Sequence, residues 1–444
     1  GISCFAFDTS NGELKLLNKQ FQINPSYLSI ASIMHSSSIK LETKSSTYLF
    51  AVSEILASKK PVIHSYTINE NHSLSLINTQ AIEGGCPCHI HYFKNSEKFK
   101  IDNKISSEWL NDEIEELKKL DNLEIKTRTS VAAYHGYNYL LARENLTDHL
   151  SKDEKENKVR QRLLKIRAKK VIVATGSLER PLVFNNNDRP GIMLSSAVKK
   201  YSDYYGVACG KKNIFFTNND TAYESAISLN KKGIKVEAII DIREKSNTAF
   251  TKEIENLGIK IYRSHTVVNT GGYKKINKIT IMELSRDGQS FTSSEKINLD
   301  CDCLAIAGGW TPAVHLFTQS GGKLKFREKD QVFIPNEYPS EQISIGSCNG
   351  DFELDDIIKN STKSLKEFLN IKETEFDNLE INCPKDNEIR NIWLLPSDKV
   401  LGKTKPFVDY QNDATAKDIK LALREGFRSI EHVKRYTTTG MGTD

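Results

Sequence analysis

One short segment, residues 171–176 (VIVATG), constrains the fold of this chain more than any other. Its first three residues form a β-branched run, as expected for a strand that is buried on both faces. The small residues that follow, Ala174, Thr175 and Gly176, let the backbone approach a ligand or a second chain segment closely. We therefore expect a core strand of an α/β fold that ends in a candidate binding turn.

Residues 213–241 have the pattern of a strand, a helix and a second strand. Hydrophobic residues fill 214–216 and all positions of 236–240 except Glu237, and apolar positions recur on one helical face between them. Gly233 is expected to end the helix, because glycine readily adopts the left-handed backbone that follows many helices. Asp241 ends the second strand, about 20 residues after the first turn, where an acidic residue binds the ribose in dinucleotide-binding folds.

The turn between the first of these strands and the helix, residues 217–220 (TNND), has no glycine. A phosphate-binding loop needs glycines so that a pyrophosphate can reach the N–H groups of the helix N-terminus, and the chain contains no G-x-G-x-x-G. We expect Asn219 or Asp220 to cap the helix and the carboxylate to repel phosphate, so that the unit keeps its fold without its phosphate site. The alternative is that Asn218, Asn219 and Asp241 bind a ribose or an amide.

Glycines after two further expected strands complete the set of candidate binding residues. Gly308 and Gly309 follow a strand expected over 299–306, and Trp310 behind them either lines a ligand cleft or is a core aromatic, with neither favoured. Gly346 follows a strand expected over 343–345. The candidate cofactor-binding residues are Gly84, Gly85, Ala174, Thr175, Gly176, Asn218, Asn219, Asp241, Gly308, Gly309 and Gly346.

The cysteines are expected to be ordinary thiols. Residues 86–91 (CPCHIH) have the residue types of a zinc site, but a single C-x-C without a second pair is a weak signal. A thioredoxin-like pair would need two intervening residues, so Cys86 and Cys88 do not form one, and we expect no metal site. Cys301 and Cys303 alternate along the strand expected over 299–306, so they should face the same side, in the core.

Composition excludes two classes of partner. The chain is 38% hydrophobic and 27% charged, as in globular proteins, and no apolar run is long enough to span a bilayer. A net charge of +5 is small beside 62 basic and 57 acidic residues, which does not indicate nucleic-acid binding.

The length of 444 residues predicts two or three domains. The cysteine usage and the lack of a secretory signal predict a cytoplasmic protein. The chain starts at Gly1 and stops inside a polar motif, so we expect a fragment.

Several blocks of sequence resemble the alpha subunit of heterotetrameric sarcosine oxidase, from about residue 84 to the end. The segment 167–194 carries ERP at 179–181 and NDRPG at 187–191, and its ATG turn resembles that of flavin- and nicotinamide-dependent proteins with two dinucleotide-binding domains. The other blocks are 147–149 (TDH), 205–207 (YGV), 217–223 (TNNDTAY), 308–316 (GGWTPAVHL), 407–413 (FVDYQND), 431–437 (EHVKRYT) and 440–441 (GM).

The resemblance implies an α/β chain with the two-dinucleotide-binding-domain flavoprotein fold of pyridine nucleotide-disulfide oxidoreductases. Its first domain is expected to be incomplete and split between residues 84–205 and 300–375, with a nested second Rossmann-like domain at 206–299. Residues 376–444 are expected to form a small helical linker domain that leads to a missing aminomethyltransferase domain. Residues 1–83 stay unassigned, as a remnant or an unrelated region.

The resemblance also implies a function, the oxidative demethylation of sarcosine (N-methylglycine) to glycine with dioxygen and tetrahydrofolate. NAD is expected to bind this chain, FAD and FMN the partner subunit or its interface, and tetrahydrofolate the missing C-terminal domain. The expected partners are beta, gamma and delta-type subunits and a small-molecule substrate. No catalytic residue is indicated in this chain, and we expect the fragment alone to be inactive.

Departures from the family pattern leave two other functions open. Ser347 follows Gly346, where two-domain flavoproteins usually have the aspartate that holds the flavin ribityl chain. Related opine and proline dehydrogenase subunits carry cysteines for an iron–sulfur centre near residues 409–413, and this chain has none there, which argues against a cluster. The alternatives are a stand-alone FAD- and NAD-dependent reductase that uses Cys86 and Cys88, and a non-catalytic or decayed interaction module.

Overall fold

The computed structural model describes the strands between residues 2 and 81 and residues 99–441, except 247, 373–377 and 385–387. Two antiparallel sheets precede residue 82, one of them in the order β3-β4-β5-β6. Their strands are β1 (Ile2–Phe7), β2 (Leu14–Gln20), β3 (Pro25–His35), β4 (Lys44–Ser53), β5 (Val62–Ile68) and β6 (Leu74–Ala81). The candidates Gly84 and Gly85 and the cysteine–histidine cluster at 86–91 lie outside the described residues.

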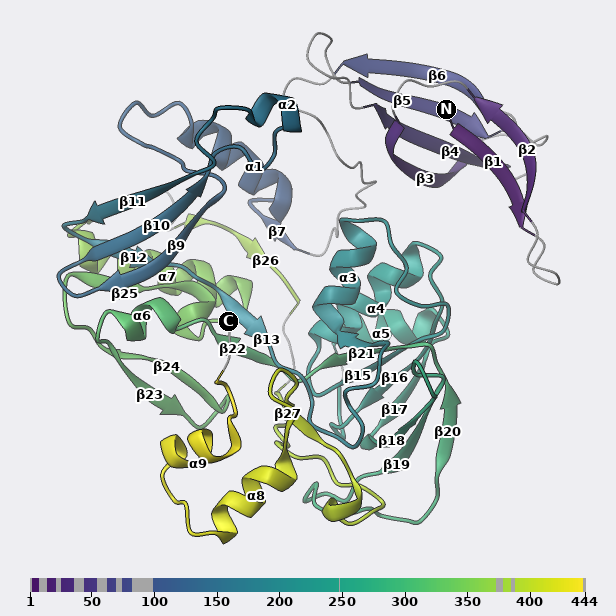
Figure 1. Cartoon of the computed structure of the whole chain (residues 1–444), viewed down its shortest axis with the longest axis vertical. Helices are drawn as coiled ribbons and strands as arrows, with labels where there is room; N and C mark the ends of the chain where they lie inside the picture. Colours follow the sequence, from purple (N-terminus) through teal and green to yellow (C-terminus); the bar gives the residue numbers. More distant parts are fainter. Residues whose placement is uncertain are drawn as a thin grey trace.

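A five-stranded parallel sheet forms the centre of the nested domain, with helices on one of its faces (Figure 1). Its order is β14 (Ile192–Leu194), β21 (Cys303–Ala307), β15 (Asn213–Thr217), β16 (Val236–Asp241) and β17 (Lys260–Arg263). The helices are α3 (Ser195–Asp203), α4 (Thr221–Lys231) and α5 (Ala249–Asn256). The strand–helix–strand unit predicted over 213–241 is therefore confirmed, and Gly233 follows α4 with φ +77.

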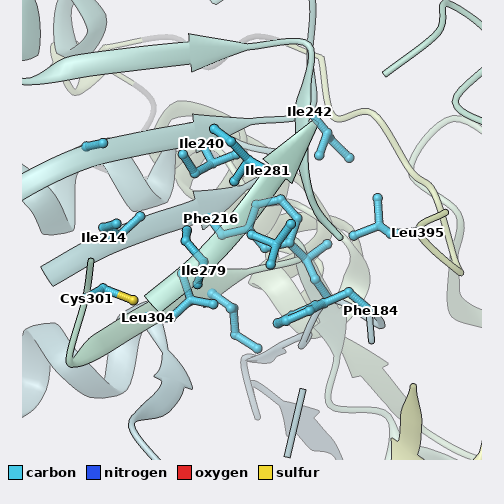
Figure 2. Close-up of a cluster of buried hydrophobic side chains, with 14 of the residues drawn as sticks. Phe184, Ile214, Phe216, Ile240, Ile242, Ile279, Ile281, Cys301, Leu304 and Leu395 are labelled. Atoms are coloured by element: carbon cyan, nitrogen blue, oxygen red, sulfur yellow. The ribbon is translucent and has the colours of Figure 1, made fainter. Parts of the chain in front are cut away.

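The second face of this sheet packs on an antiparallel sheet of β18 (His265–Gly271), β19 (Lys278–Glu283) and β20 (Ile297–Asp300). Because side chains alternate along a strand, Ile214 and Phe216 face this second sheet while Phe215 faces the helices. Figure 2 shows the resulting cluster, which Leu395 joins from a distant part of the chain. Each such large apolar side chain contributes about 1.5–3 kcal/mol when it is fully buried.

The parallel sheet of the nested domain includes strands on both sides of the range 206–299. Residues of β14 pair with those of β21, and β21 pairs with β15, so strands on both sides of that range complete the sheet. β14 has only three residues, all half-buried, and so lacks the long apolar run by which a core strand is recognised in a sequence.

The strand expected over 299–306 is also broken, at residues 301–302. The carboxylate of Asp302 accepts the backbone N–H groups of Lys211 and Lys212 at 3.1 and 2.7 Å, which turns the chain between β20 and β21. Cys301 consequently packs in the cluster that faces the antiparallel sheet, and Cys303 in the cluster that faces the helices. The expectation that the two thiols face the same side was wrong, although both are buried.

The first domain surrounds a parallel pair, β12 (Val171–Val173) and β25 (Gln342–Ser344). One face of this pair packs on the antiparallel sheet of β9 (Thr129–His135), β10 (Tyr139–Asn145) and β11 (Gln161–Arg167). Parallel sheets normally have more strands and two covered faces, yet among the described residues β12 pairs with β25 alone and Ile172 is 42% exposed. This small sheet agrees with a first domain that is incomplete.

The remaining elements connect and surround these two domains. The first domain is extended by α1 (Ser106–Leu117), α2 (Lys152–Lys155), α6 (His315–Gln319), α7 (Leu354–Leu369), β7 (Lys100–Ile101), β8 (Lys104–Ile105), β23 (Lys323–Arg327), β24 (Val332–Glu337) and β26 (Ile381–Asn382). The two domains are joined by β13 (Ser177–Glu179) and β22 (Trp310–Pro312), which pair with each other. No helix among the described residues is both long and apolar enough to cross a membrane.

The C-terminal unit contains β27 (Phe407–Asp409), β28 (Ala414–Thr415), α8 (Ala416–Arg424) and α9 (Ile430–Thr437), drawn in yellow in Figure 1. A capping box begins α8, because the carboxylate of Asp418 accepts both the backbone N–H and the hydroxyl of Thr415, at 2.8 and 2.6 Å. Gly426 ends this helix with φ +96. A small helical unit after the second domain is therefore present.

Candidate functional site

The described candidate residues lie in two places, each at the carboxyl ends of the parallel strands of one sheet. Ligands of open α/β sheets bind at such ends. The nested edge, at the ends of β15, β16 and β21, holds Asn218, Asn219, Asp241, Gly308 and Gly309. The first-domain edge, at the ends of β12 and β25, holds Ala174, Thr175, Gly176 and Gly346.

At the nested edge, the chain itself uses the backbone N–H groups of the turn after β15. The N–H of Asn218 donates to the carbonyl of Ala307 at 3.2 Å, and the N–H of Asn219 to the hydroxyl of Thr217 at 3.0 Å. The N–H of Thr221 donates to Oδ1 of Asn219 at 3.1 Å, so Asn219 supplies the polar side chain at the start of α4. These are the donors that a pyrophosphate would need.

The asparagine side chains of this turn are equally occupied. Nδ2 of Asn218 donates to the carbonyl of Gly308 at 3.3 Å, and its Oδ1 accepts from Nδ2 of Asn219 at 2.8 Å. Asn219 also donates to the carbonyl of Ala307 at 3.2 Å. Both residues are buried, at 2% and 3% exposure.

An ion network that the sequence analysis missed lies beneath the turn. Nη2 of Arg243 donates to Asp220 at 2.7 Å and to Asp241 at 2.8 Å, and all three side chains are buried. The hydroxyl of Tyr223 donates to Oδ2 of Asp241 at 2.7 Å, and the N–H of Arg243 to its Oδ1 at 2.9 Å. Asp241 therefore ends β16 as predicted, but both of its oxygens are bound by groups of this chain.

The carboxylates of this network also shift the pKa values of Arg243 and Tyr223, which bind them. Burial on its own lowers the pKa of Arg243, but the hydrogen bonds and charges of Asp241 and Asp220 outweigh burial and hold the pKa above its ordinary value. Burial raises the pKa of Tyr223, and the charge of Asp241 raises it further. At neutral pH the network thus contains a charged guanidinium and a protonated phenol, both directed at carboxylates.

A dinucleotide placed at the nested edge would compete with the contacts that this chain makes with itself. Its phosphates would face the carboxylate of Asp220 and would find N–H groups that are already bonded. A ribose would find both oxygens of Asp241 occupied. The interpretation that this unit keeps the fold without its phosphate site, and the alternative that Asn218, Asn219 and Asp241 bind a ribose or an amide, both stay predictions.

Gly308 and Gly309 serve the packing of the chain on itself. A Cβ on Gly308 would lie 2.8 Å from the carbonyl oxygen of Arg180 and 2.9 Å from that of Pro181. Gly309 has φ +94, and a Cβ there would lie 2.9 Å from the guanidinium of Arg180. Because both residues lack a side chain, the segment at Arg180 and Pro181, which joins the two domains, can pack against them. Trp310, which follows them, is half-buried on β22.

The first-domain edge, in contrast, has room beside its glycines. Gly176 and Gly346 have φ +75 and +69, and a Cβ on either would meet no atom closer than 3.8 Å. Ala174 and Thr175 are exposed, and the hydroxyl of Thr175 donates to the carbonyl of Ala313 at 2.7 Å. The backbone can approach a ligand here, which a dinucleotide site requires.

One further carboxylate lies at the first-domain edge and was missed. The N–H of Asp351 donates to the carbonyl of Gly346 at 3.3 Å, and its Oδ1 accepts from Asn360 at 2.8 Å. Its Oδ2 is buried and has no hydrogen-bond partner in the described part of the chain. The Gly-Asp pair of the sequence, at 350–351, is the signal that could have drawn attention to it. Among all residues that the structure describes, no group of three or more His, Cys, Asp or Glu could hold a metal ion.

Comparison with known proteins identifies the family. The sarcosine oxidase A3 domain family matches residues 403–444. The alpha subunit of sarcosine oxidase from Corynebacterium sp. (strain P-1) is 32% identical over 355 residues, which are 78% of this chain and 36% of that protein. This chain is a homologue of the sarcosine oxidase alpha subunit. The corresponding subunit of Rhizobium meliloti (strain 1021) is also 32% identical, over 79% of this chain and 34% of its own length.

The resemblance found in the sequence is thus confirmed, and the chain spans about a third of the length of these alpha subunits. Among solved structures, the L-proline dehydrogenase of P. horikoshii is similar with a TM-score of 0.50 and 19% identity. The similarity covers 78% of this chain and 61% of that one. It supports the two-domain flavoprotein fold with a small C-terminal helical unit.

Proposed function

We propose that this chain is the alpha-type component of a sarcosine oxidase-like complex, which demethylates sarcosine to glycine with dioxygen and tetrahydrofolate. The identity of 32% to named alpha subunits over 78% of the chain carries this proposal. Beta, gamma and delta-type subunits would complete the complex. FAD and FMN would lie in the partner or at its interface, and tetrahydrofolate in an aminomethyltransferase domain outside this sequence.

In the complex, this chain would supply the nucleotide-binding scaffold of the alpha subunit. The flavin of the partner, when bound, accepts the hydride that leaves the N-methyl group. In this chain we assign no catalytic side chain, and the polar groups of the nested edge are bonded to one another. NAD would bind at the first-domain edge, where Gly176 and Gly346 leave space for a ligand. The nested domain would extend from β14 to β21, between two parts of the first domain.

Co-production with a beta-type flavoprotein subunit tests the proposal. We expect this chain alone to be colourless and to consume no dioxygen with sarcosine. The co-purified complex should consume dioxygen and release hydrogen peroxide with sarcosine, but not with glycine, which has no N-methyl group. A beta-type subunit purified without this chain is the matched control.

Two results would replace the proposal with a different function. If this chain alone purified with FAD and oxidised NADH, it would be the stand-alone reductase, for which Cys86 and Cys88 would then be substituted in turn. If it neither joined a beta-type subunit nor bound a nucleotide, it would be a non-catalytic interaction module.

A further inference from the structure

A segment near the C-terminus, residues 390–395 (RNIWLL), lies across the nested edge, and we call it the strap. The carbonyl of Arg390 accepts Nδ2 of Asn218 at 3.2 Å, in the turn after β15. The guanidinium of Arg390 donates to the carbonyl of Ile242, just after β16, at 2.6 Å. It also donates to the carbonyls of Ser285 and Arg286, at 3.1 and 2.8 Å. One residue thus joins the ends of two central strands to a loop of the antiparallel sheet.

The far end of the strap is buried in the nested domain. Leu395 is 3% exposed and lies in the cluster with Phe184 and Ile242 (Figure 2). Its N–H donates to the carbonyl of Val183 at 3.0 Å. Ile392 lies against Gly288, where a Cβ would come within 2.6 Å of its Cδ1. Displacement of the strap would therefore expose apolar surface as well as break hydrogen bonds.

The middle of the strap contacts the first domain. Oδ1 of Asn391 accepts from Nη2 of Arg180 at 3.1 Å, and its Nδ2 donates to the carbonyl of Asp330 at 3.4 Å. The guanidinium of Arg180 lies 5.0 Å from the centroid of the Trp393 ring, and Nε1 of Trp393 donates to Gln331 at 3.4 Å. The strap therefore links both domains at the place where a nucleotide of the nested domain would approach the first domain.

We propose that the strap and the Asp220–Arg243–Asp241 network close the nested edge, so that this second dinucleotide-type domain binds no dinucleotide. The strap covers the turn from outside, and the network fills the positions of the phosphate and ribose from inside. The nested domain is then a structural unit fixed to the first domain. This inference does not depend on the substrate of the complex, and it holds whether or not NAD binds at the first-domain edge.

Hydrogen exchange of the full chain, with and without excess NAD⁺, is the decisive experiment. We expect the amides of 218–222, 241–243 and 391–395 to exchange slowly without nucleotide, and NAD⁺ to leave their rates unchanged. Slower exchange at 218–222 and 241–243 on addition of NAD⁺ would overturn the proposal. Fast exchange of 391–395 in the unliganded protein would overturn it as well, because the strap would then not cover the edge.

The variant Arg390→Ala tests whether the side chain of Arg390 holds the strap in place. It removes three hydrogen bonds from a charged donor, so the amides of 391–395 should exchange at least roughly tenfold faster. The exposed Arg428→Ala is the matched control and should leave these rates unchanged. If Arg390→Ala does not fold, Asn391→Ala removes the contacts with Arg180 and with the carbonyl of Asp330, and should also speed exchange in the strap. Unchanged rates in the folded variant would contradict the proposal.

Discussion

At the scale of single residues, Arg243 compensates two carboxylates that solvent does not reach. Removal of one partner from such a buried pair typically destabilises a protein by about 3–5 kcal/mol, because a charge is left without compensation. Nothing in the sequence distinguishes Arg243 from the other basic residues among a total of 62. It lies two positions after Asp241, but its pairing with Asp220, 23 positions earlier, depends on the parallel arrangement of β15 and β16.

Tyr223 gives a sharp test of the same network. Tyr223→Phe keeps the buried ring but removes the donor to Oδ2 of Asp241. We expect the free energy of unfolding to fall by about 1–3 kcal/mol, since hydrogen bonds to charged groups have this value. Urea unfolding at neutral pH measures it. The control Tyr273→Phe changes a ring that is 93% exposed and should have no effect, and equal stability of the two variants would contradict this assignment.

At the scale of elements, the sequence predicted the helices and strands that depend on contacts between residues close together in the chain. The helix of the strand–helix–strand unit was expected to end at Gly233 and is observed at Thr221–Lys231. Its apolar face, with Ala222, Ala226 and Leu229, is buried against the sheet. The break between β20 and β21 could not be predicted in this way, because it depends on Asp302 binding N–H groups about 90 positions away.

Asp409 connects two turns of the C-terminal unit. Its carboxylate accepts the N–H groups of Gln411 and Asn412 at 2.8 and 3.2 Å, Nδ2 of Asn412 at 3.0 Å and the N–H of Gly440 at 2.6 Å. The hydrogen bond from the Asn412 side chain, followed by that from Gly440, lowers the pKa of Asp409 from 3.8 to about 2. In the sequence, this loop is part of the block 407–413 that resembles the family, but the role of Asp409 in joining the two turns is not visible there.

The lowered pKa predicts how the stability of this unit depends on pH. A carboxyl group whose pKa is lower in the folded state stabilises the fold above its unfolded value, near pH 4, and loses that contribution as the pH falls to about 2. Asp409→Asn should lower the melting temperature at neutral pH and weaken its dependence on pH over this interval. The exposed Asp413→Asn is the control. Parallel melting curves for wild type and Asp409→Asn over this interval would contradict the role of Asp409.

At the scale of the whole molecule, the buried side-chain amide of Asn187 joins the C-terminal unit to the segment that precedes β14. Nδ2 of Asn187 donates to the carbonyl of Phe407 at 2.9 Å, and its Oδ1 accepts the N–H of Phe407 at 2.8 Å. The hydroxyl of Tyr410 donates to the carbonyl of Asn187 at 3.2 Å. Two blocks that resemble the family, 187–191 and 407–413, are therefore in contact, although about 220 positions separate them.

Asn187→Ala should loosen this junction. The buried N–H and carbonyl of Phe407 would lose their partner, which costs about 1–3 kcal/mol for each unsatisfied group. We expect faster hydrogen exchange across 407–437, with the rates of β15 and β16 unchanged. Asn122→Ala, at an exposed turn, is the control. If exchange rose equally in both regions, or in neither, the amide would not be the link between the two units.

The sequence by itself determined the family, the α/β class and the strand–helix–strand unit, because short-range periodicity and turn residues encode these features. It also predicted that the turn at 217–220 has no phosphate site, and that prediction needs only the missing glycines. Tertiary structure alone decided what occupies that site instead. Arg243, Arg390 and Leu395 come from distant parts of the chain, and their contacts form only when the sheets stack and the strap crosses them. Residues 171–173 form the predicted strand β12, but the expected burial on both faces was wrong, because Ile172 is 42% exposed where the parallel sheet has only two described strands. In the turn after it, a Cβ on Gly176 would meet no atom closer than 3.9 Å, and the binding role of this turn stays a prediction.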